Sequence, residues 1–174
     1  SEKQLKSAAG RPRFGGCPGS LSRMFAAGPA HDEEKAGEPG REITSRLGNW
    51  PVQLNLAPLQ APYFDGATVL ICADCVPFAL AGFHSRFLAG KTLLIGCPKL
   101  DDAGHYLEKL TAIFSRNDIR AVEVLIMEVP CCSGLAHIVR QAVDRSGKSL
   151  LVTMFRVGIR GDVLDKIEAA PSAV

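Results

Sequence analysis

Apolar residues recur along the second half of the chain in short continuous runs that alternate with amphipathic stretches. The runs cover residues 67–75, 91–97, 121–129 and 149–159, and they are rich in Val, Ile and Leu. Continuous apolar runs of this length are typical of strands that are buried on both faces of a parallel sheet. The pattern therefore predicts four buried strands.

The stretches between these runs have the spacing of helices. Residues 77–90 predict one or two helical turns, whereas residues 101–118 and 133–147 predict longer helices with apolar side chains on one face. Asp101 or Asp102 is the expected N-cap of the first long helix. Strands that alternate with helices predict a small α/β domain, with a mostly parallel sheet, right-handed crossovers and helices on both faces.

The flanking segments have a different pattern. Residues 1–48 contain recurrent Gly and Pro and a charged run, without lasting apolar periodicity, which predicts a mostly irregular N-terminal arm. The alternation over residues 52–56 predicts a half-buried strand. We therefore expect an arm over 1–48, an α/β domain with a cysteine-rich rim over 49–162, and a C-terminal tail over 163–174.

Composition and charge narrow the class of protein. The chain has 174 residues, 47% of them hydrophobic, which suits one domain and excludes collagen and wholesale disorder. No apolar run reaches the roughly 18 residues of a membrane span, and the N-terminus has no apolar core of a secretory signal. The 20 basic and 18 acidic residues alternate along the chain, which does not favour nucleic acid as a partner. We expect a cytoplasmic protein.

Six cysteines carry the candidate chemistry, and five of them fall between residues 72 and 132. Without a signal for export, thiols are kept reduced, so clustered cysteines indicate metal or redox chemistry rather than structural disulfides. Cys72 and Cys75 end the first buried run, Cys97 ends the second, and Cys131 and Cys132 follow the third.

Topology predicts that these five thiols meet. The carboxyl ends of parallel strands lie at the same edge of a sheet, where open α/β sheets bind their ligands. Cys72, Cys75, Cys97, Cys131 and Cys132 are therefore the predicted ligands of an iron–sulfur cluster or another metal. His84, in the first crossover, and Cys17, on the arm, are further candidate ligands.

Three alternatives remain open at this level. The first is a zinc site, structural or hydrolytic, with three cysteines and His84. The second is a thioredoxin-like redox pair formed by Cys72 and Cys75. The third is a protein-interaction module without metal, in which the thiols are small buried apolar groups. The phosphate-binding and catalytic motifs GxGxxG, GxxxxGK[ST], HExxH and GxSxG do not occur, so no independent catalytic motif is present.

Several motifs resemble a known family. CADCVPFA at 72–79, GCPKLDD at 96–102 and MEVPCCSG at 127–134, together with CPGS at 17–20, resemble the C-terminal domain of ferredoxin-type 4Fe-4S iron–sulfur cluster-binding oxidoreductases of anaerobic bacteria. The similarity extends from about Gly15 to about Gly161.

The resemblance implies an iron–sulfur cluster, of the 4Fe-4S type, and electron transfer with redox partner proteins. In that family a ferredoxin module with a CxxCxxCxxxCP run precedes this domain, and this chain contains no such run. A more distant similarity links the chain to the delta subunits of methyl-viologen-reducing hydrogenases, which bind an iron–sulfur cluster.

Overall fold

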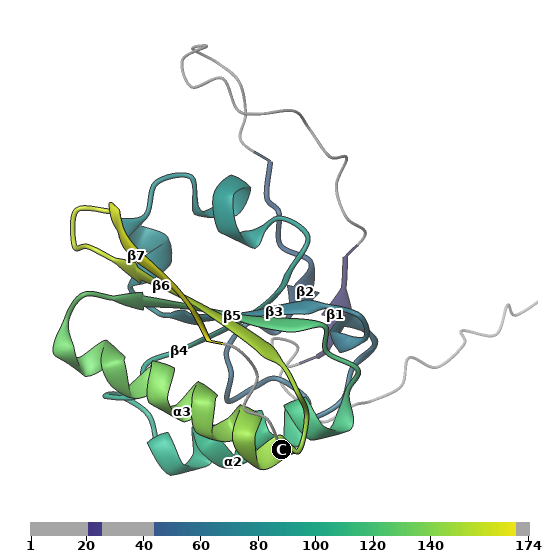
Figure 1. Ribbon diagram of the computed structural model, residues 1–174. Coiled ribbons are helices and arrows are strands. Elements are labelled where there is room, and N and C mark those ends of the chain that lie inside the picture. The colour runs from purple at the N-terminus through teal and green to yellow at the C-terminus, as the bar shows by residue number, and fades with distance from the viewer. Residues whose placement is uncertain (1–20, 26–43, 170–174) are drawn as a thin grey trace, which may run out of the picture.

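A five-stranded sheet forms the centre of the structure, a computed structural model that describes residues 21–25 and 44–169 (Figure 1). The strands are β3 (Thr68–Ala73), β4 (Thr92–Gly96), β5 (Ala121–Met127), β6 (Leu151–Val157) and β7 (Val163–Ala169). Their spatial order is β4-β3-β5-β6-β7, and only β7 is antiparallel to its neighbour. The predicted α/β fold with a mostly parallel sheet is confirmed.

Two long helices cover one face of the sheet, α2 (Ala103–Arg116) and α3 (Pro130–Ser146) (Figure 1). The carboxylate of Asp102 caps α2 by accepting hydrogen bonds from two backbone N–H groups of the first turn. At the C-terminal end of α3, Gly147 adopts the left-handed conformation that ends the helix (φ 69°). Both helices bury an apolar stripe, so the sheet and this layer share one core.

Shorter helical segments cover the opposite face. They are α1 (Val76–Ala79) and a π-helix, η3 (His84–Leu88), and the chain enters β3 through the 3-10 helix η2 (Pro62–Phe64). The ring of Phe87 in η3 contacts the ring of Phe155 in β6, with the centroids 5.1 Å apart. Helices on both faces agree with the prediction.

The connection that follows β3 lies on one face of the sheet, and the connections that follow its two neighbours, β4 and β5, lie on the other face. The chain after β3 passes through α1 and η3 on one face, whereas the chains after β4 and β5 enter α2 and α3 on the other (Figure 1). This reversal at the carboxyl ends of neighbouring strands is the place where open α/β sheets form a binding crevice.

The predicted strand over residues 52–56 is wrong. Shortly before it, Asn49–Trp50 form β2, which pairs with β1 (Arg23–Met24). Strand β1 lies inside the predicted irregular arm. Residue Gln53 makes only an isolated bridge to Ile95 of β4. The chain then turns, because the carbonyl of Gln53 accepts hydrogen bonds from two later N–H groups. The alternating pattern thus marks burial against an edge strand rather than a strand in its own right.

The prediction of a tail from residue 163 is also wrong as far as residue 169, because residues 163–169 form β7 at the edge of the sheet. Three of the seven residues of β7 are charged, and its apolar residues neither form a continuous run nor alternate regularly, so the sequence pattern alone does not indicate a strand there. Among the described residues, no helix is long and apolar enough to cross a membrane.

Candidate functional site

The first two thiols of interest lie where β3 ends. Cys72 is the fifth residue of β3 and is fully buried, and its thiol donates a hydrogen bond of 3.4 Å to the carbonyl of Ala73. Cys75 lies three residues further on, is exposed, and is the N-cap residue of α1. The loop between them is held to the next strand by the N–H of Asp74, which donates to the carbonyl of Gly96.

The next two thiols lie in the first turn of α3. The predicted start of this helix near Ser133 is three residues late, because the helix begins at Pro130. Proline is well suited to the first turn, since its missing N–H has no partner to lose there. Cys131 and Cys132 are therefore helical residues rather than the end of a strand; Cys131 is exposed and Cys132 is buried.

Electrostatic interactions link Cys132 with each of the other three thiols. Burial raises the pKa of the Cys132 thiol, a hydrogen bond with the backbone of Met127 opposes this, and Cys131 and Cys75 raise the pKa further. Burial also raises the pKa of the Cys72 thiol, with smaller contributions from Asp74 and Cys132. Cys132 thus interacts with Cys72 of β3, with Cys75 at the start of α1 and with Cys131 of its own helix.

Cys97 is placed differently. It follows β4 at the same edge and is half-buried, and its backbone N–H donates a 3.1 Å hydrogen bond to the hydroxyl of Tyr106. All five predicted thiols therefore lie where β3, β4 and β5 end, and electrostatic interactions link Cys132 with Cys72, Cys75 and Cys131.

The two remaining candidate ligands have separate outcomes. The Nδ1 atom of His84 accepts a 3.1 Å hydrogen bond from the N–H of Arg46, which ties this ring to the segment before β2 and leaves only Nε2 for another partner. Cys17 lies outside the described residues.

A polar network that the sequence did not predict lies beside the thiols. The hydroxyl of Tyr106, in the first turn of α2, donates to the carboxylate of Asp101 and accepts from Cys97. Burial raises the pKa of Asp74, the nearby Asp101 raises it further, and a hydrogen bond with Gln53 opposes both effects. The GCPKLDD segment at 96–102 was the available signal, but nothing in it indicates that a tyrosine four residues later completes the network.

The thiols are suitable donors for a soft metal centre, but they do not form a preformed site for a single ion. Four sulfur ligands are a donor set that zinc and iron–sulfur centres use. In the part of the chain that the structure describes, no group of three or more His, Cys, Asp or Glu side chains has its ligand atoms arranged to hold one metal ion. A tetrahedral zinc ion would need sulfur atoms about 3.8 Å apart, since each lies about 2.3 Å from the metal.

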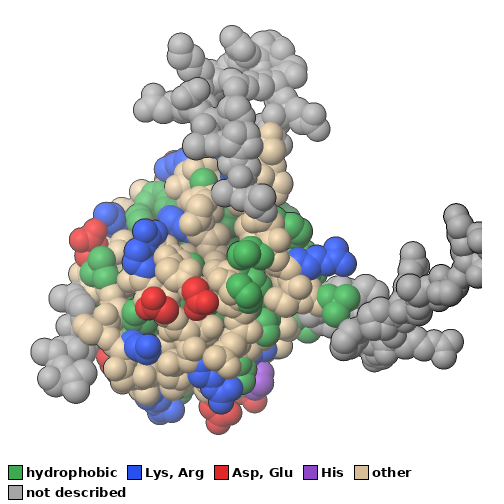
Figure 2. All heavy atoms as spheres, turned by 90° about the vertical axis from the view of Figure 1, so that its right-hand side faces the viewer, with side chains coloured by type: hydrophobic (Ala, Val, Ile, Leu, Met, Phe, Trp, Pro, Cys, Tyr) green, Lys and Arg blue, Asp and Glu red, His purple; other side chains and the backbone are tan. Residues whose placement is uncertain are grey.

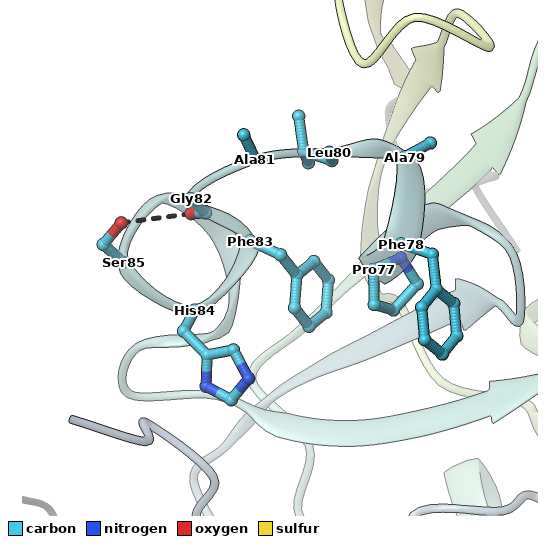
Figure 3. Close-up of a pocket in the computed structure, with 9 residues that line it drawn as sticks. All are labelled: Pro77, Phe78, Ala79, Leu80, Ala81, Gly82, Phe83, His84 and Ser85. Carbon is cyan, nitrogen blue, oxygen red and sulfur yellow. Dashed lines mark hydrogen bonds between the residues drawn. The ribbon is translucent and has the colours of Figure 1, made fainter. Parts of the chain in front are cut away.

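Two hollows lie near the site. One, of about 620 Å³, lies between the N-terminal halves of α2 and α3 and includes Cys131, Pro98 and Gly134 in its lining. The other, of about 330 Å³, is formed by residues 77–85 between α1 and η3 (Figure 3). Figure 3 shows the rings of Pro77, Phe78 and Phe83 gathered on one side of this segment. The second hollow contains no thiol, so only the first adjoins the cysteines.

The opposite end of the molecule is less distinctive. Figure 2 faces the side on which the parallel strands begin, and there Lys and Arg side chains intermix with Asp, Glu and apolar side chains. No single sign of charge covers the part of this side that belongs to described residues. The concentration of thiols at the carboxyl edge is therefore the feature that distinguishes a candidate site.

Comparison with known proteins identifies the family of this chain. The chain matches the family model of the Rossmann-like domain over residues 61–172, more than half of its length. The chain belongs to the Rossmann-like domain family. This Rossmann-like domain lacks the GxGxxG run of dinucleotide-binding sites, and cysteines occupy the strand ends instead.

A relative from the archaeon Archaeoglobus fulgidus, described as an uncharacterized protein, is 33% identical over 114 residues. The alignment covers 66% of this chain and 80% of the relative. No solved structure shows significant similarity to the chain.

Proposed function

We propose that this Rossmann-like domain binds an iron–sulfur cluster through Cys72, Cys75, Cys131 and Cys132, and that it serves electron transfer with redox partner proteins in the cytoplasm. The observation that supports the proposal is the position of these four residues at the ends of neighbouring parallel strands: Cys72 and Cys75 where β3 ends, and Cys131 and Cys132 in the first turn of α3, after β5. The electrostatic interactions of Cys132 with Cys72 and Cys75 support the same grouping.

The distribution of burial supports a bound centre. Cys72 and Cys132 lie inside the protein, whereas Cys75 and Cys131 lie at the surface. Burial and neighbouring acidic groups raise the pKa of both buried thiols and so oppose their ionisation, and a positively charged centre would offset this effect when the thiolates bind it. A centre held in this way would be shielded on one side and accessible to a partner on the other.

The spacing favours a cluster over a single ion. Cys131 and Cys132 are adjacent residues, and adjacent helical positions direct their side chains about 100° apart around the helix. A cluster with several iron corners accepts thiolates over a wider span than one tetrahedral ion does. The motif resemblance described above is consistent with the same centre. When bound, such a centre would accept and release single electrons at potentials set by its surroundings.

The decisive experiment is anaerobic purification of the chain, followed by analysis of iron, acid-labile sulfide and zinc and by absorption spectroscopy. We expect iron and sulfide in equal amounts, with absorption at about 400 nm that decreases on reduction with dithionite. If instead the protein is colourless and holds one zinc ion, or holds no metal after reconstitution with iron and sulfide, the proposal is wrong.

Variants identify the ligands. Cys132→Ser is expected to lose most of the iron while keeping its far-UV circular dichroism, because serine is nearly the same size as cysteine and the sheet does not depend on the sulfur. Cys97→Ser is the matched control, since Cys97 follows β4 at the same edge of the sheet and is not among the four proposed ligands. Loss of iron in Cys97→Ser together with retention in Cys132→Ser would assign the site to a different set of thiols.

A further inference from the structure

The two edges of the sheet differ in how they are covered. At the β4 edge, the backbone of residues 52–54 lies alongside the strand: Ile95 donates its N–H to the carbonyl of Val52, and its carbonyl accepts the N–H of Leu54. At the other edge lies β7, and no described segment pairs with its outer side. One edge is therefore covered by the chain itself, whereas the outer backbone groups of β7 have no strand partner within residues 21–25 and 44–169.

The composition of β7 is unusual for an edge that must avoid pairing. The strand has seven residues and contains no proline. Two of its large apolar side chains are exposed, Leu164 (46% of its surface) and Ile167 (49%). Long edge strands with exposed apolar side chains are templates for pairing with another strand, unless charges oppose it. The charges of β7 therefore decide whether a second strand is accepted.

The charged side chains of β7 form an ordered pattern. Lys166 and Glu168 lie on the same face of the strand and form an exposed ion pair of 2.6 Å. Ile167, between them, lies on the other face, where it pairs across the sheet with Met154. Asp165 is engaged on that face by Arg156 of β6. A basic residue and an acidic residue thus flank one exposed apolar residue at equal distances.

This pattern is self-complementary for antiparallel pairing about Ile167. In that register, Ile167 faces Ile167 of a second copy, and each Lys166 faces a Glu168. A shift that centres the pair on Lys166 places two lysines opposite each other, and a shift to Asp165 places two aspartates opposite each other. Among the registers centred on a residue of β7, the one centred on Ile167 is the one in which oppositely charged β7 residues face each other, and it also brings the two exposed Ile167 side chains together.

We propose that a second copy of this chain pairs with β7 in antiparallel orientation about Ile167, so that two five-stranded sheets join into one continuous sheet in a symmetric dimer. The proposal does not depend on the metal centre, because β7 lies two strands away from β5 in the sheet. The four charges of Lys166 and Glu168 then alternate on one face of the junction, and the outer backbone groups of β7 gain partners.

The test is the mass of the intact chain in solution, measured by light scattering after gel filtration at about 10 to 200 µM protein. The wild-type chain is expected to rise from 18.6 kDa toward twice that mass as the concentration increases. Lys166→Glu places like charges in both symmetric contacts and should raise the dissociation constant at least about tenfold. Glu168→Lys should do the same, and it serves if the first variant does not fold.

Two further variants test whether association depends on the register centred on Ile167. The double variant Lys166→Glu/Glu168→Lys restores opposite charges and should recover most of the association. Lys148→Glu, which changes the net charge equally at an exposed position outside β7, should leave association unchanged. A wild-type chain that stays monomeric over the whole range overturns the proposal. So does association that persists unchanged in both single variants, or a double variant no better than the single ones.

Discussion

Replacing Gly96 by alanine should destabilise the domain far more than a single methyl group suggests. A Cβ at this position, the last residue of β4, would lie 2.7 Å from Cζ and 2.9 Å from Cε2 of Tyr106, and closer still to the hydroxyl. Tyr106 is fully buried in the first turn of α2 and cannot move outward without leaving the core. The ring must therefore shift, or β4 and α2 must separate.

The magnitude follows from two separate losses. Overpacking of a close-packed core costs about 1–3 kcal/mol. Displacement of the Tyr106 hydroxyl also breaks its hydrogen bonds with the N–H of Cys97 and the carboxylate of Asp101, at about 1 kcal/mol each or more where a group is left buried. The expected loss is about 3–5 kcal/mol, a large part of the stability of an ordinary domain.

Urea denaturation followed by far-UV circular dichroism measures this loss. Gly134→Ala is the matched control, because its Cβ would make only ordinary contacts with Pro98 at 3.9 Å or more and alanine favours the α3 helix. It should be neutral or slightly stabilising. Tyr106→Phe should cost less in the Gly96→Ala background than alone, because the hydroxyl bonds are already lost there. If Gly96→Ala costs less than about 1 kcal/mol, or if the two changes are additive, the proposed contact does not govern stability.

Three further outcomes are expected. In the metal-free protein, iodoacetamide should modify the exposed Cys75 and Cys131 much faster than the buried Cys72 and Cys132, as peptide mass spectrometry would show. Because burial raises the pKa of Cys72, the unfolded chain loses this proton first, so the free energy of unfolding should fall between about pH 8 and 10 by up to about 1.4 kcal/mol per pH unit for this thiol. Cys72→Ser should reduce that slope in denaturation curves recorded across this pH range. Asn49→Ala should cost about 2–4 kcal/mol by thermal or urea denaturation, since this buried amide exchanges hydrogen bonds with both backbone groups of Leu93; a loss below about 0.5 kcal/mol would contradict that role.

The placement of the thiols shows where inference from sequence succeeds. Cys72 and Cys131 are 59 positions apart, yet Cys72 lies near the end of one continuous apolar run and Cys131 follows another, and both runs predict buried strands. Parallel strands deliver their carboxyl ends to one edge whatever the details of the crossovers. The structure places both residues at that edge. The electrostatic interaction of Cys132 with Cys72 links the start of α3 with the end of β3.

Local geometry at the same edge was not available from the pattern. A helix start at Pro130 rather than Ser133 differs by less than one turn, but it changes the direction of two thiols. Both starts satisfy the apolar periodicity of α3, and the decision rests on how the chain after β5 packs on its neighbours. For the same reason the sequence pattern does not indicate that the backbone N–H of Cys97 is held by the hydroxyl of Tyr106, a residue of another element.

The sequence by itself determined the class of fold, the number of buried parallel strands and the two long helices, because these follow from periodic burial within each segment. It also determined that cysteines gather at one edge. Only the tertiary structure decided the order of the strands, the pairing of β7 with β6 and the covering of β4 by residues 52–54. These features depend on contacts between segments far apart in the chain, and a polar or alternating stretch such as residues 163–169 becomes a strand only when a neighbour supplies its hydrogen-bonding partner.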